Sequence, residues 1–118
     1  MIKVVLTGAN GQLGKAFTEA LVEKGYFVYA TDINIENIKA SDSIEPVKLD
    51  ITNETMVNDF FSTIQDIGVL INNAGIGVFT PFEDRTAAEF KKVMEVNLLG
   101  LFLMSQSAVK IMKNSNGG

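Results

Sequence analysis

Three evenly spaced glycines form the first pattern in the sequence that could support chemistry. Gly8, Gly11 and Gly14 lie between an apolar run, residues 2–7, and a segment whose apolar residues recur with helical spacing. At such a strand-to-helix turn, backbone N–H groups and the positive end of the helix dipole can hold a diphosphate group. Glycine is needed because a Cβ would block the phosphates. The alternative is a turn that only packs a helix on a strand. The sequence therefore predicts a phosphate-binding turn formed by Gly8, Asn10, Gly11, Gln12, Leu13 and Gly14.

An acidic residue follows the glycine turn at a distance that suits a nucleotide ligand. Asp32 lies 18 residues after Gly14 at the end of the second apolar run, where a carboxylate can accept hydrogen bonds from an adenosine ribose. The same carboxylate would repel a 2′-phosphate by about 1 to 4 kcal/mol at ~4 Å, so NAD is favoured over NADP. Lys15 either reaches such a phosphate or faces solvent. Asp32 and Ile33 are candidate cofactor contacts, and the alternative for Asp32 is a solvated acid beside Asn34.

Strand and helix patterns alternate along the chain. Short apolar runs predict strands, and apolar residues with a period near 3.6 predict helices. The strands cover residues 2–7, 26–31, 47–49 and 69–71; the helices cover residues 13–24, 53–64 and 87–113, with a weaker pattern over 34–41. Pro46 marks a turn, Thr52 is the expected cap of the middle helix, and Thr86 with Glu89 forms a capping box. The alternation predicts an α/β fold with a doubly wound parallel (Rossmann-type) sheet of about four strands, in one domain over residues 1–118.

Composition excludes several classes of function. The 118 residues are 47% hydrophobic, enough for one core, and carry a net charge of −4, which does not favour binding to nucleic acid. The chain has no cysteine and no histidine, so we expect no disulfide, no thiol catalysis and no metal site. It also has no apolar run long enough to span a membrane and no signal-peptide pattern. We therefore expect a cytoplasmic protein.

In their order and spacing, the motifs resemble the short-chain dehydrogenase/reductase family along the entire chain. The resemblance rests on Thr7-Gly8-x-x-Gly11-x-x-Gly14, Asp32, Leu49-Asp50-Ile51, Asn72-Asn73-Ala74-Gly75 and Val96-Asn97. It implies a nicotinamide dinucleotide cofactor and hydride transfer between that cofactor and a small carbonyl or alcohol substrate.

The resemblance also implies roles for individual residues. Asp50 would meet the amino group of adenine, with Ile51 supplying main-chain and apolar contact, whereas the plain alternative for Asp50 is helix capping. Asn97 would support a water and proton relay, and its alternative is a satisfied core asparagine. The turn after the fourth strand would contact the cofactor, or else be only a polar turn, through Asn72, Asn73, Ala74 and Gly75.

Two features depart from the family's common pattern. The glycine spacing is more typical of the extended branch, which includes sugar-nucleotide epimerases. The catalytic serine and Tyr-x-x-x-Lys of the family follow the long helix, and neither Tyr26 nor Tyr29 has a lysine four residues later. Ser105 and Ser107 fit small packing residues of a helix better than substrate-polarising groups.

We therefore expect the NAD-binding N-terminal part of an oxidoreductase, inactive in isolation. The alternatives are an oxidoreductase whose catalytic residues come from a separate chain or from a continuation of this one, an extended-branch epimerase or dehydratase, and a non-catalytic binding module. The long helix from about residue 87 matches a family element that packs between subunits. Self-association into a homo-oligomer is expected as well.

Overall fold

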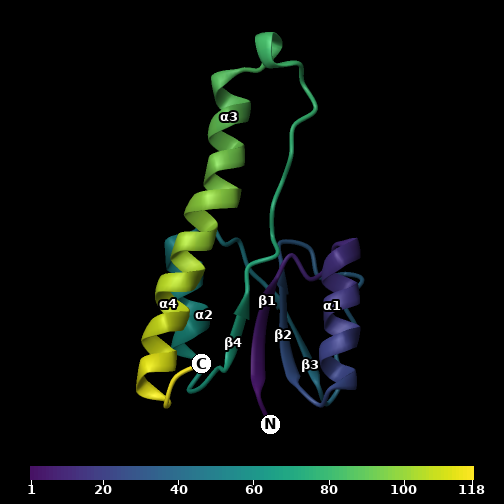
Figure 1. Ribbon diagram of the computed structural model, residues 1–118, viewed down its shortest axis with the longest axis vertical. Helices are drawn as coiled ribbons and strands as arrows, with labels where there is room; N and C mark the ends of the chain where they lie inside the picture. Colours follow the sequence, from purple (N-terminus) through teal and green to yellow (C-terminus); the bar gives the residue numbers. More distant parts are fainter.

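A parallel sheet of four strands forms the centre of the molecule (Figure 1). The computed structural model describes residues 1–118. The strands follow the order β3-β2-β1-β4, and each neighbouring pair is parallel. Val4 pairs with Val28 on one side and with Val69 on the other, so β1 is an inner strand. The bounds are β1 Lys3–Thr7, β2 Phe27–Asp32, β3 Ile44–Lys48 and β4 Val69–Ile71.

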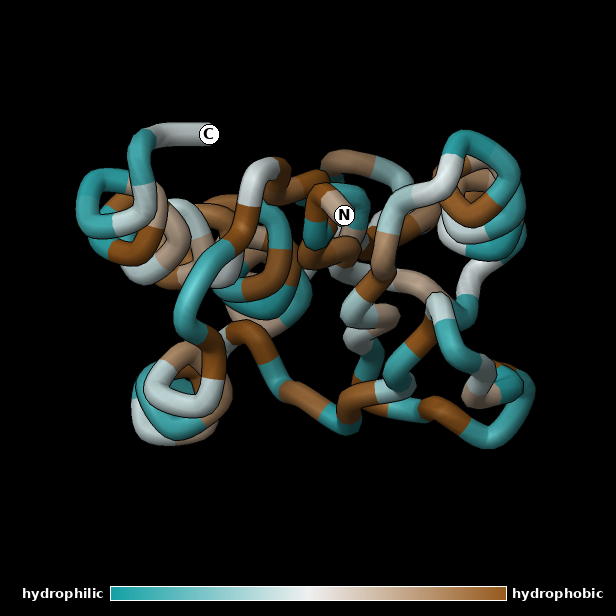
Figure 2. The backbone as a smooth tube through the Cα atoms, turned by 90° about the horizontal axis from the view of Figure 1, so that it is seen from below, coloured by the Kyte–Doolittle hydropathy of each residue, from teal (hydrophilic) through white to brown (hydrophobic).

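Helices cover both faces of the sheet, as the alternating pattern predicts (Figures 1 and 2). Leu6 belongs to one hydrophobic cluster, against which Phe17 and Leu21 of the first helix pack. Val5, its neighbour on β1, belongs to the other cluster and shares it with residues of the second and last helices. This alternation follows from the two-residue period of a strand. The α-helices are α1 Gln12–Glu23, α2 Glu54–Ser62, α3 Ala87–Met94 and α4 Leu101–Asn114.

The predicted long helix is continuous but not uniformly α-helical. Between α3 and α4, residues Glu95–Gly100 form a π-helical segment, η2. The Thr86 and Glu89 side chains form the predicted capping box at the start of α3. The chain before α3 extends past the carboxyl ends of the strands and contains a short 3₁₀-helix, η1 Phe82–Asp84 (Figure 1). None of the helices combines the length and the apolar character that a membrane span requires.

Three local predictions were wrong. Residues 34–41 form no helix, because the Asn34 side chain accepts the N–H of Glu36 at 2.9 Å and stabilises a local turn. Pro46 lies inside β3 and does not end it, since an edge strand tolerates a residue without an N–H group. The cap of α2 is Asn53 rather than Thr52, because the Asn53 Oδ1 accepts the N–H of Met56 at 3.0 Å.

Candidate functional site

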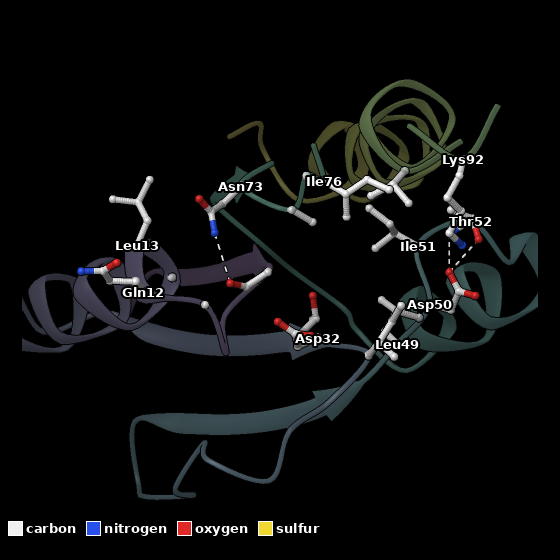
Figure 3. A pocket seen from close by; sticks show the side chains of 18 residues that line it. Gln12, Leu13, Asp32, Leu49, Asp50, Ile51, Thr52, Asn73, Ile76 and Lys92 are labelled. Carbon is white, nitrogen blue, oxygen red and sulfur yellow. Dashed lines mark hydrogen bonds between the residues drawn. The ribbon is translucent and has the colours of Figure 1, made fainter. Parts of the chain in front are cut away.

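The predicted site residues gather at the carboxyl ends of the four strands. Segments that follow β1, β2, β3 and β4 line one cleft of about 400 Å³ (Figure 3). In open parallel sheets this edge is where ligands bind. The cleft is lined by most of the predicted residues: Gly8, Gly11, Gln12, Leu13, Gly14, Asp32, Ile33, Asp50, Ile51, Asn73, Ala74 and Gly75.

The three glycines of the turn differ in how much space the protein leaves for a side chain. Gly8 has a φ of +65°, and a Cβ there would lie 2.9 Å from the Cα of Ala74. A Cβ on Gly14 would overlap the carbonyl oxygen of Gly8. A Cβ on Gly11 would meet only that same oxygen, at 3.4 Å, which is an ordinary contact. The fold therefore explains Gly8 and Gly14, whereas a Cβ on Gly11 would point into space that the protein leaves open.

Helix α1 begins beside the cleft with unsatisfied N–H groups. Its N-cap is Gly11, which supplies no side-chain hydrogen bond, and its first turn holds no acidic residue. The first N–H groups of an α-helix have no partner within the helix. Gln12 and Leu13 of this turn line the cleft. The helix end is thus suited to an anion, in agreement with the phosphate-binding prediction.

Asp32 connects the end of β2 to the glycine turn. Its Oδ2 accepts the backbone N–H of Asn10 at 3.0 Å, and its Oδ1 accepts that of Asn34 at 3.2 Å. The carboxylate is therefore fixed at the cleft by two neighbouring segments. Ile33 beside it is 59% exposed, so an apolar side chain flanks the acid. Asn10 does not line the cleft, and its own Oδ1 is buried without a hydrogen-bond partner.

Asp50 is held in a local turn and does not cap α2. Its Oδ1 accepts the hydroxyl of Thr52 at 2.7 Å and the backbone N–H of Thr52 at 2.9 Å (Figure 3). The Thr52 hydroxyl, then its N–H, lower the pKa of Asp50 below its ordinary value; partial burial opposes this, and the charge of Lys92 lowers the pKa further. Its Oδ2 receives no hydrogen bond from the protein. Asp50 thus offers a charged acceptor to the cleft.

The turn after β4 is fixed to the turn after β1. The buried hydroxyl oxygen of Thr7 accepts the N–H groups of Asn73 at 3.0 Å and Ala74 at 2.9 Å. The Asn73 amide donates to the carbonyl of Gly8 at 3.2 Å. Asn72 lies outside the cleft, where its amide donates to Ser105 of α4 at 3.1 Å. Of the two asparagines, Asn73 is therefore the one that shapes the cleft.

Asn97 lies on η2 and holds the chain that leaves the cleft. Its Oδ1 accepts the N–H of Ile76 at 2.8 Å, and its Nδ2 donates to the carbonyl of the same residue at 2.9 Å. The side chain is exposed, so it is not a core asparagine. π-helical segments occur frequently at functional sites. A Cβ added to Gly75 would lie 3.3 Å from the Oδ1 of Asn97, so Asn97 borders the site.

Sequence reasoning missed six residues that line the cleft. Thr31 and Leu49 end or follow predicted strands, so their neighbours Asp32 and Asp50 already pointed to them. Lys92 and Val96 come from the long helix, and only the direction of that helix across the sheet brings them to the site. The six are Thr31, Leu49, Thr52, Ile76, Lys92 and Val96.

The chain is similar to known proteins of the family that its motifs resemble. The family model for short chain dehydrogenase matches residues 3–118. The chain is 33% identical to the NAD-dependent glycerol dehydrogenase of Listeria innocua, over 97% of this chain and 48% of that protein. It is 30% identical to the NADP-dependent (R)-specific alcohol dehydrogenase of Lentilactobacillus kefiri, over 97% of this chain and 50% of that protein.

A solved structure shows the same fold. The short chain dehydrogenase from Leptospira borgpetersenii, with bound NAD+, superimposes with a TM-score of 0.91 at 36% identity, over 97% of this chain and 47% of that one. The chain spans about half the length of the relatives it matches. The family match covers nearly all of the 118 residues, and the cleft gathers the motifs on which the resemblance rests. The chain belongs to the short chain dehydrogenase family.

Proposed function

We propose that this chain binds NAD(H) as the cofactor-binding part of an oxidoreductase. One observation carries the proposal: the open N-terminus of α1 and the Asp32 carboxylate line the same cleft. The first suits a diphosphate and the second suits a ribose, and a dinucleotide contains both. The Leptospira structure with NAD+ and the NAD-dependent relative support the assignment.

Each end of the cleft would hold a different part of the cofactor. Gly11, Gln12 and Leu13 would receive the diphosphate, and Asp32 the adenosine ribose. Asp50, with the main chain of Ile51, would receive adenine. We place the nicotinamide at the opposite end, beside Gly75 and Ile76. Asn97 holds Ile76 there through a hydrogen bond to its N–H group. The adenosine end of the cofactor would then lie at the ends of β3 and β2, and the nicotinamide end at the end of β4.

NAD is the expected form of the cofactor. The carboxylate of Asp32 is fixed by two N–H groups, so it cannot turn away from a ligand without breaking hydrogen bonds. A 2′-phosphate beside it would be repelled. The NADP-dependent relative shows that the family includes the other preference. The fixed position of Asp32 is the reason for expecting NAD here.

The bound nicotinamide would supply the hydride, and the chain's own residues bind and orient it. In the family that the chain belongs to, the general acid is the tyrosine of Tyr-x-x-x-Lys. Tyr26 and Tyr29 are followed at that spacing by Ala30 and Ile33. We therefore expect the 118-residue polypeptide to bind cofactor without turning over a carbonyl or alcohol substrate. The substrate class of the oxidoreductase remains a small carbonyl compound or alcohol.

An extended-branch epimerase or dehydratase is the second candidate function. The Thr7-Gly8-x-x-Gly11-x-x-Gly14 spacing favours it, since that branch shares the spacing. Both candidates need the same dinucleotide, so cofactor binding does not distinguish them. Binding of a nucleoside diphosphate sugar in addition to NAD+ would favour the second candidate.

The experiment is a calorimetric titration of the 118-residue chain with NADH. Gly11→Val is the test variant, because its side chain would meet little protein but would occupy the space in front of α1. Gly77→Val is the matched control, because nothing lies within 4 Å of a Cβ at Gly77. We expect binding by the wild type and the control, and at least about a tenfold loss, or ~1.4 kcal/mol, in Gly11→Val.

Thermal unfolding of all three proteins accompanies the titration. Equal unfolding temperatures would show that Gly11→Val acts on the ligand and not on the fold. A folded wild type that binds no NADH at saturating concentration would contradict the proposal. Equal binding by wild type and Gly11→Val would show that the glycine turn does not bind the diphosphate.

A further inference from the structure

Lys92 is the only cationic side chain among the residues that line the cleft. It comes from α3, whereas the acidic lining residues come from the sheet: Asp32 ends β2 and Asp50 follows β3. In Figure 3 its side chain reaches from the helix toward Thr52 and Asp50. A residue of the long helix thus completes the end of the cleft that is otherwise formed by the segment after β3.

The helix places Lys92 there through a packed face. Lys92, Val96 and Gly100 are spaced by four residues, and Val96 also lines the cleft. Gly100 is in close contact with Ile51, since a Cβ on Gly100 would lie 2.5 Å from its Cδ1. This face of α3 and η2 is therefore fixed against the loop after β3. The neighbouring Lys91 does not line the cleft and lies in a separate apolar groove on the long helix.

Lys92 and Asp50 offer a hydrogen-bond donor and an acceptor at the same end of the cleft. The Oδ1 of Asp50 already accepts two bonds from Thr52, but its Oδ2 accepts none. Lys92 forms no salt bridge, because the only ion pair within 4.0 Å joins Lys3 to Asp66. The ammonium group and the free carboxylate oxygen therefore both have capacity to bind a ligand.

A donor beside an acceptor matches one type of purine edge. A 6-aminopurine presents an amino donor next to a ring nitrogen that accepts, whereas a 6-oxopurine presents an oxygen acceptor next to a ring N–H donor. Asp50 suits the amino group, and Lys92 suits the accepting nitrogen. We propose that Lys92 is a specificity-determining residue that selects an adenine over a 6-oxopurine at this end of the cleft. The inference rests on the proposed dinucleotide function and adds a residue to it.

The test compares NAD+ with nicotinamide hypoxanthine dinucleotide, which differs only at the purine. Calorimetry on the 118-residue chain gives the affinity ratio of the two ligands for wild type, Lys92→Met, Lys92→Arg and Lys91→Met. We expect wild type to prefer NAD+ by about tenfold or more, because the 6-oxopurine leaves Asp50 without a donor and opposes an N–H to Lys92. Lys92→Met should reduce the ratio to below about threefold.

The two control variants separate specificity from charge and from folding. Lys92→Arg keeps a cationic donor and should keep most of the preference. Lys91→Met removes the same charge from the adjacent position and should leave the ratio unchanged. Lys92 is exposed, so unfolding temperatures of all variants should agree with that of wild type.

Each other outcome has a definite meaning. If Lys92→Met weakens both ligands by the same factor, Lys92 acts only as a positive charge near an anionic ligand, and the inference is overturned. Equal affinity of wild type for both ligands overturns it as well, while NAD+ binding itself still stands. If a folded wild type binds neither ligand, the proposed function fails and the inference fails with it.

Discussion

The carboxylate of Asp32 connects two backbone segments and also lines the cleft. Each oxygen accepts one backbone N–H, from Asn10 and from Asn34, and the group still lines the cleft. Carboxylate oxygens have more than one lone-pair site, so both tasks are compatible. The residue is therefore held by the glycine turn, and we propose that it also determines which cofactor fits.

Asp32→Asn should change the preference between NADH and NADPH. The amide keeps an acceptor oxygen for one of the two N–H groups, loses the other hydrogen bond, and removes the negative charge that would face a 2′-phosphate. We expect NADH to bind less tightly and NADPH more tightly, with the ratio moving by about tenfold, because two like charges at ~4 Å repel by about 1 to 4 kcal/mol. Fluorescence titration with both reduced cofactors measures the ratio.

Asp42→Asn is the matched control for this prediction. Asp42 is an exposed acid in the loop before β3 and does not line the cleft. The same loss of charge should leave both affinities unchanged there. An unaltered ratio in Asp32→Asn would show that the carboxylate serves the turn alone, which is the solvated-acid alternative that the sequence leaves open.

At the scale of elements, Thr7 connects two strand ends that are far apart in sequence. Its hydroxyl oxygen accepts the N–H groups of Asn73 and Ala74 and donates to the carbonyl of Ile71 at 3.5 Å. The side chain is only 1% exposed, so water cannot replace it. The β4 turn is therefore held at the cleft by this hydroxyl group together with the hydrogen bond from the Asn73 amide to Gly8.

Thr7→Val should destabilise the protein more than Thr31→Val. Valine has nearly the same shape as threonine, but at residue 7 it leaves the N–H of Ala74 without an acceptor. The N–H of Asn73 loses one of its two acceptors and keeps the carbonyl of Ile71 at 3.1 Å. An unsatisfied N–H group costs about 1–3 kcal/mol and the hydrogen bond that Asn73 loses adds about 1 kcal/mol, so we expect a loss of about 2–4 kcal/mol in the free energy of unfolding. Urea unfolding followed by circular dichroism measures it.

The Thr31 comparison keeps burial and chemistry the same. Its hydroxyl donates a single bond to the carbonyl of Leu6 at 2.9 Å, and the side chain is fully buried. Thr31→Val should cost only about 1 kcal/mol, because no N–H group loses its acceptor. Equal costs for the two variants would mean that Thr7 does not hold the turn.

Local patterns were sufficient to predict most elements, and tertiary context explains the rest. The four strands and the helices on Leu13, Val57 and Phe90 follow from hydrophobic periodicity, which a sequence displays directly. The turn predicted at Pro46 was wrong because β3 is an edge strand, where a proline is tolerated. Which strand lies at the edge depends on the whole sheet and cannot be seen in a local pattern. The π-helical segment Glu95–Gly100 was not predicted, because the apolar residues of the long helix follow the ordinary helical period.

The same distinction applies to the candidate site. Gly11, Asp32 and Asp50 could be predicted because each follows a strand, and parallel strands end at the same edge. Lys92 could not, because a helix residue reaches that edge only through the way the long helix crosses the sheet. The prediction from sequence therefore covered the parts of the cleft formed by strand ends. On the long helix it named Asn97 but did not predict that Lys92 and Val96 line the cleft.

At the scale of the whole molecule, the long helix exposes an apolar stripe. Phe90, Met94, Leu98 and Phe102 are 58%, 38%, 56% and 53% exposed and line one groove. A four-residue repeat drifts by about 40° per step around an ordinary α-helix. The wider turns of η2 offset this drift, so the four side chains remain on one face. A monomer would leave this face in water.

Charges beside the stripe suit a second copy of the chain. Lys91 and Glu95 line the same groove, one helical turn apart. When two identical helices pair antiparallel about a two-fold axis, the lysine of one copy faces the glutamate of the other. The stripe is therefore complementary to itself in charge as well as in hydrophobicity. We predict that the protein forms a homodimer through α3, η2 and α4.

Leu98→Glu should convert the dimer into a monomer, as measured by sedimentation velocity at micromolar concentration. A carboxylate at the centre of the stripe would be buried beside its symmetry mate, and an unpaired buried charge costs several kcal/mol. Lys110→Glu, an exposed charge change on α4 outside the groove, should leave the mass unchanged. A monomeric wild type would contradict the prediction, and a dimer that survives Leu98→Glu would move the interface elsewhere, with the free edge of β4 as the next surface to test.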